Sequence, residues 1–99
     1  MIIHRIQDGS ALTLALEGRL DTTTVTELNA VIEGGLDGIE DLTFDFGGLE
    51  YISSAGLRTL LVAQKHINAS KGRMKVTNVN DVVNEVFEVT GFSDILEIE

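Results

Sequence analysis

The hydroxyls of Ser53 and Ser54 and the imidazoles of His4 and His66 are the side chains that nucleophilic catalysis would need in this chain. A serine becomes a nucleophile when a base lies within hydrogen-bond reach of its hydroxyl. His66 and Ser54 fall on the same expected helix, where a rise of about 1.5 Å per residue places them roughly 18 Å apart. A nucleophile elbow needs glycine two positions before the serine, where Ile52 stands. His4 stays open as a base but has no supporting context in the sequence. The sequence therefore predicts no catalytic residue and a protein that is not an enzyme.

Metal ions and phosphate-bearing cofactors also lack the residues that usually hold them. The chain has no cysteine, which excludes thiolate ligands and disulfides. Asp37, Glu40 and Asp41 do not have the spacing of a calcium loop, and we expect a solvated loop there. The double glycines at 34–35 and 47–48 lack the lysine of a phosphate-binding loop and are typical of chain breaks. We expect no metal and no cofactor.

Two roles are open to Ser53 and Ser54 if they begin a helix. A serine hydroxyl can accept a hydrogen bond from the free N–H groups of the first turn, which is a purely structural role. The same helix end also tolerates an added anion, because it carries partial positive charge. A phosphoryl group would add about −1.5 to −2 charges. It would leave the fold intact while disturbing a partner surface that fits the neutral hydroxyl.

The strands that must position these serines follow from alternating apolar residues. Strands are predicted at residues 2–6, 12–17, 42–46 and 74–77, with a last short one at 95–98. Asp8-Gly9-Ser10 predicts a hairpin turn between the first two. Gly47-Gly48 is expected to break the third strand, after which residues 49–52 run into the serines.

Helical spacing predicts three helices: one after Asp21, one from the serine pair to Ile67, and one after Asn80. Thr24 and Glu27 have capping-box spacing at the start of the first helix, although Asp21 or Thr22 could also cap it. Gly91 is expected to end the third helix in the left-handed conformation. The apolar residues of that helix that should face the core are Val82, Val83, Val86 and Phe87.

The resulting order is ββαβαβαβ, which predicts an α/β fold. Strands separated by helices pair in parallel through right-handed crossovers, whereas the N-terminal hairpin is antiparallel. The sheet should therefore be mixed and packed against about three helices. A length of 99 residues fits one domain, residues 1–99.

The charge and hydropathy of the chain narrow its partners. A net charge of −9 disfavours nucleic acid and anionic membrane surfaces, because both require basic residues. No apolar run approaches the roughly 20 residues that span a bilayer, and the N-terminus does not have the pattern of a signal peptide. We therefore expect a cytoplasmic protein with a protein partner.

Three segments together resemble one bacterial family, the STAS domains of anti-sigma factor antagonists. LTFDFGGLEYISSAGLRTLL resembles the family's strand and the loop that begins its second helix. LEGRLDTTT resembles its G-x-L-D segment, with Gly18, Leu20 and Asp21 in matching places. VFEVTGFSDILEI resembles the end of the domain. The resemblance spans nearly the whole chain.

The resemblance implies signal transduction by partner switching in transcription regulation. Alignment on Gly56-Leu57 places Ser54 on the phosphorylated serine, with Ser53 as the alternative. The unphosphorylated protein would sequester an anti-sigma factor that is also a serine kinase, phosphorylation would release it, and a metal-dependent serine phosphatase would reverse the step. The implied partner-binding residues are Asp21, Thr22, Ser53, Ser54, Gly56, Leu57 and Arg58.

A different function on the same fold stays open, because function depends on the site and not on the fold. STAS domains also serve as accessory modules of transporters and as binders of small ligands. A ligand-sized cavity without a signalling partner would favour this alternative.

Overall fold

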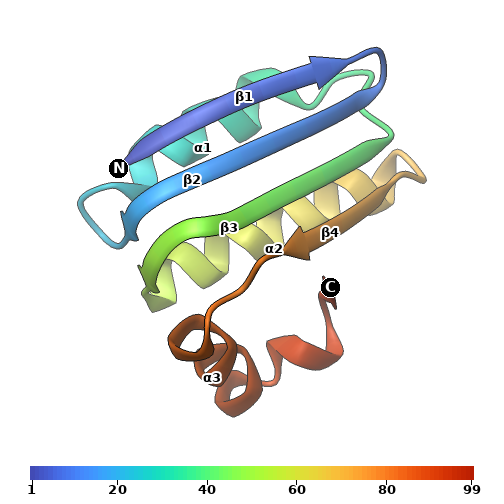
Figure 1. The fold of residues 1–99 in the computed structure, drawn as a ribbon. Coiled ribbons are helices and arrows are strands. Elements are labelled where there is room, and N and C mark those ends of the chain that lie inside the picture. Colours follow the sequence, from blue (N-terminus) through green and yellow to red (C-terminus); the bar gives the residue numbers. More distant parts are fainter.

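A computed structural model describes residues 1–99 and shows a five-stranded sheet with three helices (Figure 1). The predicted order ββαβαβαβ is confirmed. None of the helices combines the length and apolar character needed to cross a membrane. The strands are β1 (Ile2–Asp8), β2 (Ala11–Leu20), β3 (Asp41–Ile52), β4 (Arg73–Thr77) and β5 (Glu97–Ile98). The helices are α1 (Val25–Gly35), α2 (Ser54–Ala69) and α3 (Asp81–Thr90), and a 3₁₀ turn, η1 (Phe92–Asp94), follows α3.

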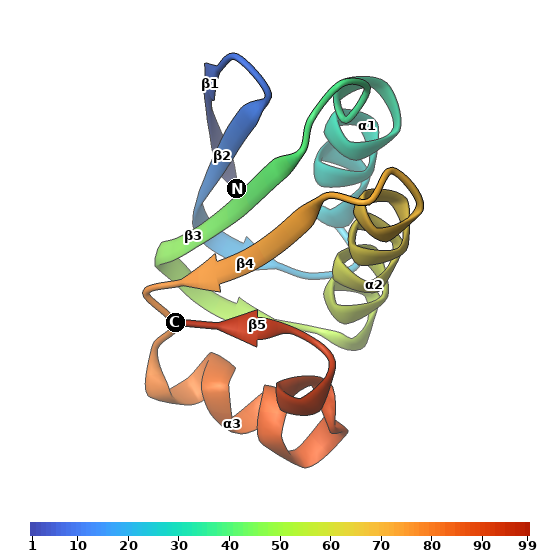
Figure 2. The same cartoon turned by 90° about the vertical axis from the view of Figure 1, so that its right-hand side faces the viewer.

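The strands lie in the order β1-β2-β3-β4-β5, the same as their order along the chain. β1 and β2 form the predicted antiparallel hairpin, and the other three pairs are parallel. Figure 2 shows α1 and α2 side by side on one face of the sheet, with α3 beyond its β5 edge. The sheet is therefore covered by α1 and α2 on one face only, and the N-terminal end of α2 lies where β2 and β3 end.

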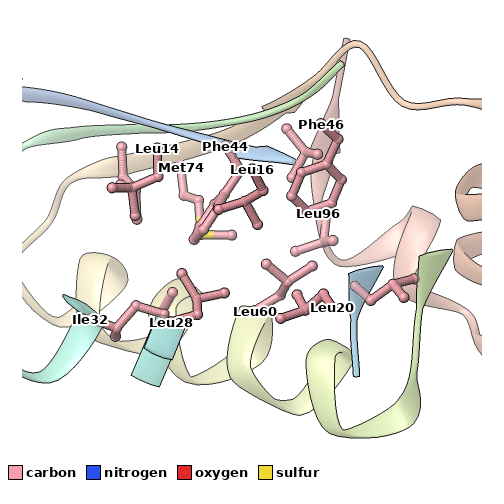
Figure 3. Close-up of a cluster of buried hydrophobic side chains, with 14 of the residues drawn as sticks. Leu14, Leu16, Leu20, Leu28, Ile32, Phe44, Phe46, Leu60, Met74 and Leu96 are labelled. Carbon is pink, nitrogen blue, oxygen red and sulfur yellow. The ribbon is translucent and has the colours of Figure 1, made fainter. Parts of the chain in front are cut away.

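The hydrophobic core lies between the sheet and these helices. A cluster of 22 buried residues fills it, with every second residue of β2 and the first half of β3 pointing inward. Figure 3 shows side chains of the sheet, such as Leu14, Phe44 and Phe46, facing Leu28 and Leu60 of the helices. Phe46 also packs at 6.3 Å, between ring centroids, on Phe87, which attaches α3 to the same core.

The third strand does not break at Gly47-Gly48, where the sequence predicted an interruption. β3 continues to Ile52 and shifts its register against β2 twice by one extra residue. These bulges let Phe46, Leu49 and Ile52 all face the core although they are three residues apart. A Cβ at Gly48 would lie 2.8 Å from Glu17 Cγ, so glycine is needed there for close strand packing.

The third helix begins and ends as predicted, but it buries fewer residues. Asn80 caps it by accepting from the Val83 N–H at 2.8 Å, and Gly91 has a φ of +81°. Val83 and Phe87 are buried, whereas Val82 is 55% exposed. The prediction that Val82 faces the core was wrong, because a helix at the edge of the sheet buries only a narrow stripe.

Candidate functional site

The first turn of α2 starts at Ser53, which has an extended backbone with φ −96° and ψ 175°. The Ser53 hydroxyl accepts a hydrogen bond from the Gly56 N–H at 3.3 Å, and its carbonyl accepts from the Leu57 N–H at 2.9 Å. Its own N–H donates to the Leu20 carbonyl at 2.9 Å. Ser53 is therefore the N-cap of α2 and also ties the loop to the end of β2.

Ser54 is the first residue of α2 and has a different environment. Its side chain is exposed, and its hydroxyl makes no hydrogen bond to the protein. Of the two neighbouring serines, Ser53 uses its hydroxyl to hold the helix, while Ser54 presents a free hydroxyl to solvent. A residue at this position can be modified without breaking any contact that the fold uses.

Gly56 lets α2 approach the sheet closely. A Cβ at this position would lie 2.8 Å from both Ile52 Cγ1 and Leu20 Cγ, which belong to buried side chains. Real side chains do not tolerate such contacts, so the first turn of α2 could not sit at this depth with a larger residue. Leu57 is also buried. Gly56 and Leu57 thus support the helix start from beneath and do not form its surface.

The turn before α1 lies beside this helix start and is held by Asp21. Its Oδ1 accepts from the Thr23 N–H at 3.0 Å, the Thr24 N–H at 3.2 Å and the Thr23 hydroxyl at 2.7 Å. The Thr23 hydroxyl is the main cause that lowers the pKa of Asp21, followed by the Thr23 N–H. The carboxylate is therefore held in its charged form.

The capping box expected from Thr24 and Glu27 does not form. The Thr24 hydroxyl accepts from the Asp21 N–H at 3.0 Å and donates to the Arg19 carbonyl at 2.7 Å, so it faces back toward β2. It makes no hydrogen bond into α1. Asp21, the alternative considered above, supplies the side-chain acceptor for this helix entry.

Arg19 and Tyr51 complete this end of the sheet, and sequence reasoning missed both. They are cross-strand neighbours on β2 and β3, and the guanidinium carbon of Arg19 lies 4.4 Å from the centre of the Tyr51 ring. Arg19 Nε is also 3.8 Å from Asp21 Oδ2. The pairing depends on the bulges in β3, which shift the register, so no local pattern connects the two residues.

The remaining residues that the sequence analysis singled out differ in their exposure and in their place in the fold. Thr22 and Arg58 are exposed, with Arg58 one helical turn after Ser54 on α2, whereas Asp21 and Ser53 are half-buried. The two histidines lie elsewhere: His4 is on β1, bonded to Glu17, and His66 is near the end of α2. Neither histidine therefore supplies a base to Ser54, and no group of three or more His, Cys, Asp or Glu could hold a metal ion.

Comparison with known proteins places the fold in one family. The family profile described as "Mlab, STAS domain" matches residues 3–97. BtrV of Bordetella bronchiseptica, a candidate anti-sigma factor antagonist, is 33% identical over 88 residues, which are 88% of this chain and 76% of that protein. The anti-sigma-B factor antagonist of Staphylococcus aureus is 29% identical over 82 residues, 82% of this chain and 76% of that protein.

Solved structures agree on the fold. The anti-sigma factor antagonist SpoIIAA of Bacillus is known in an unphosphorylated and a phosphorylated form, which match with TM-scores of 0.79 and 0.78 at 19% identity. Each match covers 99% of this chain, and 87% and 91% of those chains respectively. Taken with the profile match and the relative that is 33% identical, these findings mean that the chain belongs to the STAS domain family.

Proposed function

We propose that this protein is an anti-sigma factor antagonist whose binding is switched at Ser54. In its unphosphorylated form it binds an anti-sigma factor that is also a serine kinase. That kinase transfers the γ-phosphoryl group of ATP to the Ser54 hydroxyl, which loses its proton, and the complex dissociates. A metal-dependent serine phosphatase hydrolyses the phosphate and restores binding.

The observation that carries this proposal is the contrast between the two serines. Ser53 is occupied as the N-cap of α2, whereas the Ser54 hydroxyl is exposed and free. A kinase can reach Ser54 without unfolding the helix. The names of the relatives BtrV and the Staphylococcus aureus antagonist supply the class of partner.

The physical effect of the phosphate is local. At the first residue of a helix the added charge faces the unpaired N–H groups and the positive end of the dipole, so the fold tolerates it. Against a partner surface that fits a neutral hydroxyl, the same charge would have to be desolvated. Phosphorylation therefore weakens the complex while the protein stays folded.

The test is capture of partners from the native lysate with wild type, Ser54→Ala and Ser54→Asp, followed by mass spectrometry. Wild type and Ser54→Ala should retain a kinase-like regulator that Ser54→Asp loses. Ser93→Asp is the matched control, because Ser93 is also exposed but lies on η1 and not on α2. Its capture should equal that of wild type.

A second measurement tests the acceptor itself. Incubation of the captured kinase with ATP should label wild type and Ser53→Asp but not Ser54→Ala. If all variants capture the same proteins, or if transporter subunits are captured whatever residue stands at 54, the switch is refuted and the accessory role is favoured.

A further inference from the structure

A groove runs between α1 and α2 and begins beside Ser54. Its volume is about 290 Å³, and its walls include Val25 of α1 and Val62 of α2. Val62 is 47% exposed, so its apolar side chain is accessible from solvent. The two helices lie side by side on one face of the sheet (Figure 2), and residues of both line the groove. It therefore offers an apolar surface that continues from the helix start described above.

The floor of this groove has no unpaired polar group. The Thr59 hydroxyl reaches across from α2 and donates to Asn29 Oδ1 of α1 at 2.9 Å. No buried side-chain nitrogen or oxygen in the protein lacks a partner. An apolar side chain could enter the groove without leaving a buried donor or acceptor unpaired. Each buried polar group left unpaired would cost about 1–3 kcal/mol.

The rim of the groove is charged, with opposite signs. Arg58 lines it on α2, and Glu33 lines it near the C-terminal end of α1. Arg58 is exposed and makes neither a hydrogen bond nor an ion pair, whereas each of the other three arginines contacts a carboxylate or another acceptor. In a chain of net charge −9, one guanidinium is thus left free beside Ser54.

Ser54 and Arg58 are four residues apart on α2, so they are neighbours on one face of the helix. An anion that lies N-terminal to a cation at this spacing is the favourable orientation, and a phosphate can accept two parallel hydrogen bonds from a guanidinium. A phosphate on Ser54 is therefore placed to engage Arg58. It would then take this guanidinium away from any carboxylate outside the chain.

We propose that the Arg58 guanidinium binds two anions in turn. It binds a carboxylate of the partner in the unphosphorylated protein and the phosphate on Ser54 after phosphorylation. In the unphosphorylated protein, a segment of the anti-sigma factor places an apolar side chain between Val25 and Val62 and a carboxylate on Arg58. Glu33 repels a carboxylate at the other end, which fixes the orientation of the segment. After phosphorylation, the phosphate occupies Arg58. This inference rests on the proposed function, in which Ser54 is the modified residue.

The first test needs no partner and no kinase. Phosphoserine is incorporated at position 54 during synthesis of the full chain, and the arginine Nε–H signals are compared by NMR with those of the unmodified protein. Arg58→Lys removes one signal and so assigns it. Water exchange at the Arg58 Nε–H should slow by about threefold in the phosphorylated protein. The signal of Arg73, which is already paired with Glu97, should not change.

The second test uses the regulator captured by Ser54→Ala. Arg58→Gln in the unphosphorylated protein should weaken its binding about tenfold, which corresponds to roughly 1.4 kcal/mol. Lys65→Gln removes the same charge farther along α2 and should change the affinity less than twofold. Both residues are exposed, so both variants should fold.

The outcomes separate this inference from the proposed function. The proposal that Arg58 binds both anions is refuted if the phosphate does not change water exchange at the Arg58 Nε–H. It is also refuted if Arg58→Gln binds the regulator as well as Lys65→Gln does. The Ser54 switch would still stand if Ser54→Asp loses the regulator. If no regulator distinguishes the Ser54 variants, the proposed function fails, although slowed Arg58 exchange would still establish the contact with the phosphate.

Discussion

Replacement of each serine by alanine should separate the two hydroxyls by their effect on stability. Ser53→Ala removes the acceptor of the Gly56 N–H, and loss of an N-cap serine costs about 0.5–2 kcal/mol. At 3.3 Å this hydrogen bond is long, so we expect the lower half of that range, about 0.5–1 kcal/mol. Ser54→Ala removes no hydrogen bond, and its effect should stay within about 0.5 kcal/mol.

The assay is thermal unfolding followed by far-UV circular dichroism, since the chain has no tryptophan and one tyrosine. For a chain of this length each kcal/mol shifts Tm by about 4–8 °C, so Ser53→Ala should lower Tm by roughly 2–8 °C. Ser53→Asp is the control, because aspartate also accepts from the first turn and should retain Tm. A loss of stability in Ser54→Ala equal to that in Ser53→Ala would show that the hydroxyl roles have been assigned wrongly.

Three further substitutions test the contacts that hold the start of α2, the turn before α1, and α3 in place. Gly56→Ala should cost about 1–3 kcal/mol in urea unfolding through overpacking, whereas Gly34→Ala, which meets no atom within 4 Å, should be neutral or stabilising. The lowered pKa of Asp21 means that its carboxylate stabilises the fold above its ordinary value of 3.8 and that this contribution is lost as the pH falls below it. Asp21→Asn keeps an acceptor, so its Tm should fall less steeply than wild type as the pH drops in that acid range. Phe87→Ala should cost about 3–5 kcal/mol by denaturant titration and release α3, and a cost below 1 kcal/mol would contradict the packing described for this helix.

The element order could be predicted because each strand and helix has its own periodic pattern. Leu12, Leu14 and Leu16 alternate over a strand that buries one face, and this pattern depends only on the period of the backbone. The break expected at Gly47-Gly48 was wrong because the continuity of this strand depends on its neighbour and not on a local pattern. Glycine weakens a strand locally, but here the bulge and the neighbouring β2 hold the strand together, and that contact is not visible in the local sequence.

The candidate site was predictable in part. The sequence indicated a helix start at Ser53–Ser54, which depends on short-range chemistry. It could not distinguish the cap from the free hydroxyl, because that depends on one side-chain rotamer. The stack of Arg19 on Tyr51 requires the register of two strands that are about 30 residues apart in the chain, and only the folded sheet supplies it.

The identical order of strands in the chain and in the sheet bears on how the protein is made. Each strand after the hairpin joins an edge left open by its predecessor, so no strand must be inserted between two that are already paired. Because closing short loops costs the least entropy, we expect the sheet to grow from its N-terminal edge as the chain leaves the ribosome. Pulse-labelled hydrogen exchange during refolding should show β2 and β3 protected no later than β4 and β5. The serines directly follow β3, so we expect them to reach their final places together with that strand and not with the later β5 edge.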